Sequence, residues 1–132
     1  MTLTHLNPDH LTGSPVFSQG VLSTRTGLVY VGGQNGTDSA GTLREGFAAQ
    51  TEQAYRNVLA VLEAAGCSTE DVLKLSIYIT GDEDVSEGLA AAQRVWGDQP
   101  TAITVLRVHG LARPDALVEI EAVAETPTIA TH

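Results

Sequence analysis

Residues 117–124 read LVEIEAVA and alternate between two sets of side chains. In a β-strand, successive side chains point to opposite faces of the sheet. This segment therefore predicts a strand with one apolar face and a second face that carries Glu119 and Glu121. Because carboxylates are rarely buried without partners, the second face must lie against solvent, a subunit interface or a binding site. The apolar face comprises Val118, Ile120, Ala122 and Ala124.

The rest of the chain predicts two helices and four more strands. Apolar residues recur at steps of three and four along residues 43–65 and 85–96, as expected for amphipathic helices. Gly66 and Gly97 follow these segments and fit helix ends. The other strands are predicted from alternating or β-branched stretches at residues 15–22, 28–31, 73–80 and 102–108.

This order of elements, β-β-α-β-α-β-β, favours an α+β fold with a mixed β-sheet covered on one face by two helices. The other face of the sheet is not polar. One side of residues 102–108 carries Ile103 and Val105, and the opposite side carries Leu106 and Val108. A strand that is apolar on both sides is normally covered on both sides, and the predicted elements include no third layer. We therefore expect another copy of the chain to cover the second face.

Composition and charge narrow the class of protein. A chain of 132 residues with 42% hydrophobic and 17% charged residues predicts one globular domain, residues 1–132. The formal net charge is −9 and no cluster of Lys or Arg occurs, so no nucleic-acid partner is expected. No apolar stretch approaches about 20 residues, so no membrane partner is expected. The lack of signal-peptide features and the single cysteine, Cys67, which allows no internal disulfide, favour a cytoplasmic protein.

Five short segments resemble one known family. Residues 49–51 (AQT), 57–59 (NVL) and 62–66 (LEAAG) resemble the helix of the Rid family, the reactive intermediate deaminases formerly grouped as endoribonuclease L-PSP. Residues 32–34 (GGQ) resemble the Ser-Gly-Gln that follows the family's second strand, and residues 118–124 resemble its C-terminal signature. Together these segments indicate a resemblance along nearly the whole chain.

The resemblance implies a homotrimer with a chorismate-mutase-like α+β fold and a ligand cleft between adjacent subunits. Well-known members of the family hydrolyse 2-imino or enamino acids, such as 2-iminopropanoate, to 2-keto acids and ammonia. They use no metal and no organic cofactor. The expected partners of this chain are therefore a small polar metabolite and two further copies of itself.

The sequence departs from the family at the arginine that binds the substrate carboxylate. In well-known members this arginine lies in a Pro-Ala-Arg-Ser/Thr stretch, where it pairs with the carboxylate through two hydrogen bonds. Residues 100–104 here read PTAIT, so Ala102 stands at that position without a gap and Ile103 with a one-residue shift. Gly32 also replaces the family's serine. Because a charge-assisted contact contributes about 1.5–3 kcal/mol, we expect altered specificity or lost activity.

Glu119, Phe17 and Gly33 are the first candidates for the site. Glu119 matches a family glutamate and is suited to act as a general base on water; its alternative role is an interface carboxylate bonded to backbone amides. Phe17 matches an aromatic residue of the family's cleft, or is part of the core. Gly33 matches a glycine whose N–H would approach a ligand closely, or is a turn residue. Glu121 shares the face of Glu119 and is expected to be structural.

Arg107 and His109 are candidates for a second cation and a proton shuttle. If Ile103 takes the arginine's position, Arg107 lies on the same face and would reach an anionic ligand; the ungapped alignment places Arg107 on the opposite face. The alternative role of Arg107 is an interface ion pair with Glu119 or Glu121. His109 is next on the Arg107 face, where a histidine titrates near neutral pH but is commonly a surface residue.

Two functions remain open from the sequence. The first is a cofactor-independent imine or enamine hydrolase with altered substrate specificity. The second is a non-catalytic trimer, either a small-molecule-binding or a regulatory protein, that uses the same cleft for a small metabolite. The acidic charge disfavours a ribonuclease, and no spacing of His, Asp or Glu predicts a metal site.

Overall fold

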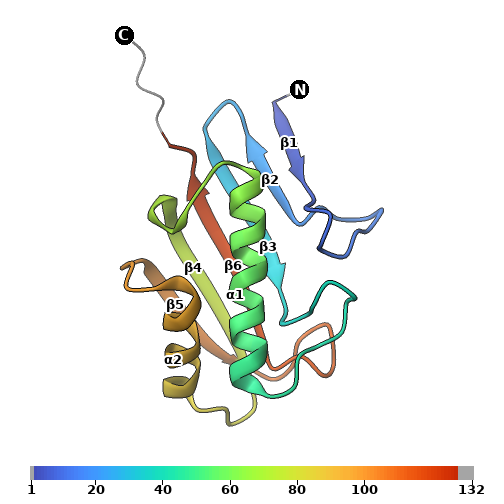
Figure 1. Cartoon of the computed structure of the whole chain (residues 1–132), viewed down its shortest axis with the longest axis vertical. Coiled ribbons are helices and arrows are strands. Elements are labelled where there is room, and N and C mark those ends of the chain that lie inside the picture. Colours follow the sequence, from blue (N-terminus) through green and yellow to red (C-terminus); the bar gives the residue numbers. More distant parts are fainter. Residues whose placement is uncertain (1, 128–132) are drawn as a thin grey trace.

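The computed structural model describes residues 2–127 and has one six-stranded sheet with two helices (Figure 1). Helices α1 (Phe47–Ala64) and α2 (Val85–Trp96) lie side by side across one face of the sheet. The predicted α+β class, with two helices on one face of a mixed sheet, is confirmed. Residues 1 and 128–132 of the predicted domain lie outside the described residues. No helix within the described part is long and apolar enough to cross a bilayer.

The strands follow the order β1-β2-β3-β6-β4-β5 across the sheet. Strands β4 and β5 run parallel, and the other neighbouring pairs run antiparallel. A parallel pair needs a crossover, and α2 provides it. A 3₁₀ turn, η1 (Thr69–Asp71), precedes β4. The strands are β1 (Leu3–Leu6), β2 (Gly20–Ser23), β3 (Leu28–Gln34), β4 (Val72–Thr80), β5 (Ala102–Val108) and β6 (Val118–Glu125).

Three predicted boundaries were wrong and one strand was missed. The strand predicted at residues 28–31 continues to Gln34, so Gly33 lies in a strand and not in a turn. The strand predicted at residues 15–22 begins only at Gly20; in the loop before it, the N–H of Gln19 donates to the side chain of Asn7, and the Gln19 carbonyl keeps one bond to the N–H of Gly32 in β3. Strand β1 was not predicted, because four residues give too short a pattern to recognise. The helix predicted from residue 43 begins at Phe47, since Gly46 has a φ of 88°, which is not helical.

The core lies between the helices and the inward face of the sheet. The alternation of residues 118–124 is confirmed: Val118, Ile120 and Ala124 have no exposed surface, and Ala122 is 3% exposed. Helix α1 places Val58 and other apolar side chains against this face. Burying each large apolar side chain stabilises the fold by about 1.5–3 kcal/mol, so this face fixes the register of β6.

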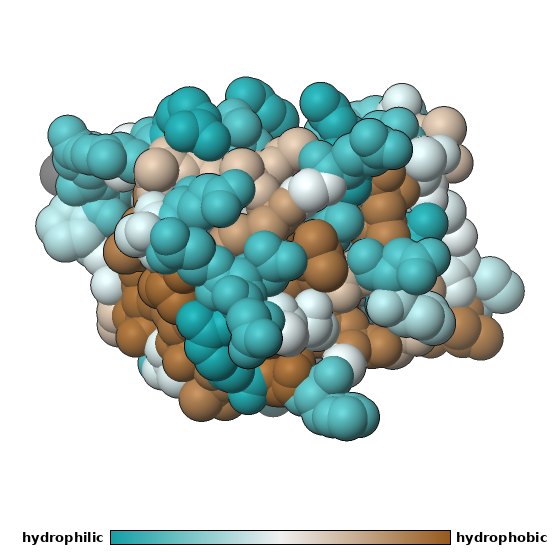
Figure 2. Space-filling model, turned by 90° about the horizontal axis from the view of Figure 1, so that it is seen from below, coloured by the Kyte–Doolittle hydropathy of each residue, from teal (hydrophilic) through white to brown (hydrophobic). Residues whose placement is uncertain are grey.

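The face of the sheet without helices keeps apolar groups in contact with solvent. Tyr30 is 58% exposed and Leu106 is 50% exposed on this face. Strand β5 is an edge strand, and on its other side Ile103 and Val105 are 47% and 37% exposed. Seen from below, hydrophobic atoms gather on the left of the molecule, where β5 and α2 lie (Figure 2). Within one chain, therefore, an apolar edge and several apolar side chains on a mixed sheet face remain uncovered.

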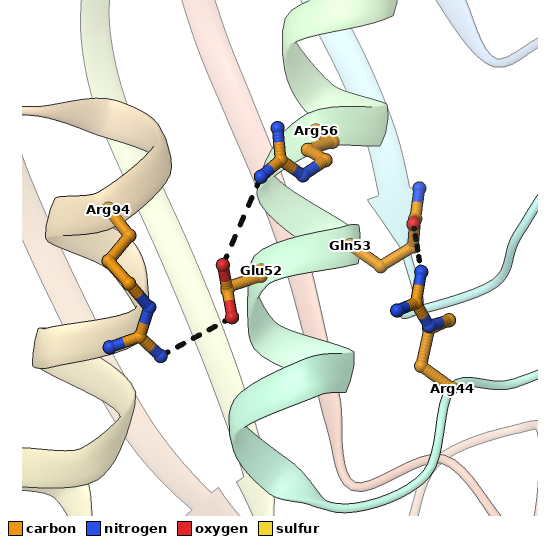
Figure 3. A network of polar contacts seen from close by, with 5 residues as sticks. All are labelled: Arg44, Glu52, Gln53, Arg56 and Arg94. Carbon is orange, nitrogen blue, oxygen red and sulfur yellow. Dashed lines mark hydrogen bonds and ion pairs between the residues drawn. The ribbon is translucent and has the colours of Figure 1, made fainter.

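The outer surface of the helices is polar. Glu52 on α1 lies between Arg56, at 3.9 Å, and Arg94 of α2, at 3.3 Å (Figure 3). Arg44 donates to Gln53 at 3.3 Å on the same surface. Exposed ion pairs of this kind contribute at most about 1 kcal/mol. These charged side chains make the outer surface of the helix layer polar, unlike the exposed apolar side chains on the other side of the sheet.

Candidate functional site

A β-bulge in β3 brings the predicted glycine and glutamate together. The pairing of β3 with β6 shifts between Val31 and Gln34, where β3 holds one extra residue. At Gly33 a Cβ atom would lie 2.5 Å from Oε2 of Glu119, so the carboxylate packs directly against the bare glycine backbone. A hydrogen in place of a side chain is what permits this approach. The bulge therefore sets the position of the Glu119 carboxylate.

The Glu119 carboxylate is half-buried and held by an amide. Asn35 Nδ2 donates to Glu119 Oε1 at 3.3 Å and to the carbonyl of Val118 at 3.1 Å. Asn35 is itself fixed by α1, because the buried Asn57 donates to the carbonyls of Asn35 and Thr37 at 3.1 and 2.9 Å. A side chain held in this way is preorganised to interact with a water or a ligand.

Helix α1 also fixes the start of β6. Gln50 is 4% exposed, and its Oε1 accepts a hydrogen bond from the N–H of Leu117 at 2.9 Å. Its backbone lies so close to Gly36 that a Cβ there would be 2.4 Å from Gln50 Cα. The polar residues of α1 therefore anchor both segments that carry the site, the loop after β3 and the entry to β6.

A cavity of about 250 Å³ opens beside this bulge. Gln34 Nε2 donates to Gln19 Oε1 at 2.8 Å, and Gln19 Nε2 donates to the carbonyl of Thr12 at 2.6 Å, so the two buried amides in its wall are paired. Phe17, which is 55% exposed, contributes an apolar wall. The cavity is lined by Phe17, Gln19, Gly33, Gln34, Asn35 and Arg113, among others.

The structure thus brings together three of the five predicted site residues. Phe17 and Gly33 line one cavity, and Glu119, which is not a lining residue, packs against Gly33. The other two lie elsewhere. His109 is exposed beyond the end of β5 and does not line this cavity.

Arg107 lies on the helix side of the sheet. It pairs in register with Ile79, which faces the core, whereas Glu119 pairs with Tyr78 on the other face. Its guanidinium donates to the carbonyls of Gly81 at 3.0 Å and Glu83 at 2.9 Å. Within the described residues of one chain it makes no ion pair with a carboxylate, and the interface ion pair with Glu119 or Glu121 stays a prediction.

Glu121 has a partner on the face without helices. Tyr78 Oη donates to Glu121 Oε1 at 2.6 Å, and this hydrogen bond raises the pKa of Tyr78 above its ordinary value. Nearby, Lys74 Nζ donates to Thr104 Oγ1 at 2.6 Å. These contacts fit the structural role predicted for Glu121.

Arg113 is the residue that sequence reasoning missed. It lies in a turn, in which the N–H of Ala116 donates to the carbonyl of Arg113 at 3.1 Å. The loop between β5 and β6 runs beside the loop after β3 (Figure 1), and this places Arg113 in the wall of the cavity. The sequence does show a cation six residues before Glu119. It does not show which way the side chain of this turn residue points.

Residues 2–127 contain no group of three or more His, Cys, Asp or Glu side chains placed to hold a metal ion. The cavity has paired amides, an aromatic wall and a guanidinium, and a positioned carboxylate lies against its Gly33 and Asn35.

The fold and the site are those of a small α+β protein with a carboxylate beside a bulged strand. Comparison with known proteins shows the family to which the chain belongs. The model of the family described as Endoribonuclease L-PSP matches residues 10–126. The chain is 33% identical over 110 residues to human 2-iminobutanoate/2-iminopropanoate deaminase, covering 82% of this chain and 78% of the human protein. The chain therefore belongs to the Rid, or endoribonuclease L-PSP, family.

Two further relatives agree with this assignment. A RutC family protein of Pyrococcus horikoshii is 36% identical over 75 residues, which cover 57% of this chain and 59% of that relative. The crystal structure of RidA from an Antarctic Psychrobacter is 31% identical, with a TM-score of 0.84, over 92% of this chain and 98% of that one. The fold expected from the sequence resemblance is thereby confirmed at the level of the protomer.

Proposed function

We propose that this protein is a cofactor-independent hydrolase of imines or enamines that acts on a small polar metabolite. The observation that carries the proposal is the Glu119 carboxylate, which packs on Gly33 and is held by Asn35, two residues that line a polar cavity. The human relative, 2-iminobutanoate/2-iminopropanoate deaminase, supports imine hydrolysis as the reaction class.

In the proposed reaction, Glu119 acts as a general base toward water. It removes a proton as the water oxygen forms a bond to the carbon of the C=N group, and the nitrogen gains a proton. The resulting carbinolamine then expels ammonia and leaves a carbonyl, so that one imine and one water give one carbonyl compound and one ammonia. A positioned general base contributes roughly 10²- to 10⁴-fold to such a step.

We also propose that the active assembly is a homotrimer with the site at the boundary between subunits. The support is the apolar surface that one chain leaves open, including Leu106 on the face without helices and Ile103 on β5. An exposed apolar patch on a soluble protein marks an interaction surface. Covering it with neighbouring copies would also enclose the half-open cavity near Glu119.

The test is Glu119→Gln, because glutamine keeps the shape and the bond to Asn35 but is not a base. Ammonia release from enzymatically generated 2-iminopropanoate is the measurement, and kcat/KM should fall by about 100-fold or more. The matched control is Glu121→Gln, on the same face of the same strand, which should retain the parent rate. Equal rates in Glu119→Gln and the parent would exclude Glu119 as the base.

A second function is favoured by one observation. Ala102 begins β5 at the position where the ungapped alignment places the family's carboxylate-binding arginine. A trimer that binds a metabolite without converting it fits this difference. It predicts no ammonia release from any imine supplied, together with a melting temperature that rises when a 2-keto acid is added.

A further inference from the structure

The Lys and Arg side chains differ in whether they form hydrogen bonds or ion pairs within the chain. The chain has seven Lys and Arg residues. Within residues 2–127, two have no hydrogen bond or ion pair to their side chains: Arg25, in the turn after β2, and Arg113. The five with partners are Arg44, Arg56, Lys74, Arg94 and Arg107.

Arg113 is distinguished from Arg25 by its place in the cavity. The cavity that Arg113 lines is also lined by Gly33 and Asn35, both of which contact the Glu119 carboxylate. The remaining described lining is neutral, so Arg113 supplies the charge in that wall. A volume of about 250 Å³ suits a metabolite of a few heavy atoms, not a polymer.

The backbone around Arg113 is held in place even though its side chain is exposed. Its carbonyl accepts from the N–H of Ala116, which is 2% exposed, and the next residue, Leu117, is bonded to the buried Gln50 of α1. A guanidinium on an anchored turn offers a planar pair of donors to a carboxylate. In a chain of net charge −9, an unpaired cation is a favourable position for an anion.

We propose that Arg113 binds the anionic group of the substrate, so that the ligand is a small carboxylate whose imine carbon lies toward Glu119. This inference rests on the proposed function and names its substrate class. Arg113 takes the role that Ala102 cannot fill and that Arg107, bonded to two backbone carbonyls, does not fill. The cation therefore comes from the loop between β5 and β6, not from β5 itself.

The test compares a charged probe with a neutral one of the same shape. Pyruvate and its amide, pyruvamide, are titrated into the full-length protein, with the backbone amide of Gly33 followed by NMR. Arg113→Gln should weaken pyruvate binding by roughly 10- to 100-fold and leave pyruvamide binding unchanged. Arg113→Lys should restore part of the affinity. Arg25→Gln removes the same charge from a turn outside the cavity and should bind both probes as the parent does.

The outcomes separate the anion site from the hydrolase. Unchanged pyruvate binding in Arg113→Gln, or equal weakening of both probes, would overturn the assignment of Arg113. Arg113-dependent pyruvate binding in a protein that releases no ammonia would support the anion site and refute hydrolysis. Ammonia release whose KM is the same in the parent and in Arg113→Gln would support hydrolysis and overturn the anion site.

Discussion

The smallest feature on which the site depends is the missing side chain at position 33. A Cβ atom added at Gly33 would lie only 2.5 Å from Glu119 Oε2, too close for two non-bonded atoms. The clash would involve the far end of a flexible side chain, which can move, and not the backbone. A methyl group at this position should therefore disturb the carboxylate much more than the fold.

Gly33→Ala tests this directly. The backbone of Gly33 does not require a positive φ, so alanine is tolerated, and the free energy of unfolding should change by about 1 kcal/mol or less. The displaced carboxylate should lose its 3.3 Å contact with Asn35, and turnover or ligand affinity should fall at least about tenfold. Urea unfolding and ammonia release measure the two effects.

Gly13→Ala is the control for this change, because nothing lies within 4 Å of a Cβ at that position. It should match the parent in both measurements. A Gly33→Ala protein with the parent's activity would mean that the position of Glu119 against the strand is not needed for function.

Single residues also mark where sequence reasoning reached its limit. The resemblance marked Gly33 and Glu119 separately, but their contact was not predicted, because Gly33 lies beyond the strand predicted at residues 28–31. The place of Arg113 was not predicted either, because the direction of a loop side chain depends on contacts between segments far apart in sequence. Arg107 lies on the helix side of the sheet, opposite Glu119, as the ungapped alignment predicted.

At the scale of elements, α1 and α2 meet through an aromatic pair. Tyr55 of α1 and Trp96 at the end of α2 have ring centroids 5.4 Å apart at an interplanar angle of 58°. Tyr55 is 3% exposed, and burial raises its pKa to about 12. The helix pair is therefore stabilised by a tyrosine that must stay protonated.

The stability of the fold should consequently fall at alkaline pH. Tyr55 titrates near 10.0 when unfolded and near 12 when folded, so its contribution is complete below pH 10 and is lost as the pH rises toward 12. A shift of this size corresponds to roughly 2–3 kcal/mol. Tyr78 shifts in the same direction because of its bond to Glu121, so the comparison is made in a Tyr78→Phe background.

Urea unfolding between pH 9 and pH 12 measures this effect. The Tyr78→Phe protein should lose stability over the range, whereas Tyr55→Phe/Tyr78→Phe should show a flatter profile. Parallel profiles for the two proteins would show that Tyr55 does not control the alkaline transition.

The elements themselves were largely predictable, and their ends were not. Residues 117–124, 73–80 and 102–108 alternate in a way that fixes their faces, and all three form strands. The loop before β2 was taken for a strand because its composition suits one; in the fold the N–H of Gln19 bonds to Asn7 Oδ1 instead of to a neighbouring strand. Side-chain bonds of this kind leave no periodic signal.

At the scale of the whole molecule, the two surfaces of the protomer have opposite character. The helix layer is polar and carries the network around Glu52 (Figure 3). The opposite sheet face and the β5 edge expose Tyr30, Leu106 and Ile103. The sequence already indicated this asymmetry, since residues 102–108 are apolar on both sides. This asymmetry alone does not determine how many copies of the chain assemble.

Leu106→Glu tests the proposed trimer. Leu106 is 50% exposed in the protomer, so glutamate there should leave the isolated fold intact, but three copies would each bury a carboxylate at the interface. Light scattering at micromolar concentration should give three times the 13.8 kDa of one chain for the parent and a lower mass for Leu106→Glu. Ala90→Glu places the same charge at an exposed position of α2, one turn before Arg94 on the polar helix surface, and should remain trimeric. A parent with the mass of one chain would rule out the proposed site between subunits, because the exposed sheet face would then be a surface in contact with water.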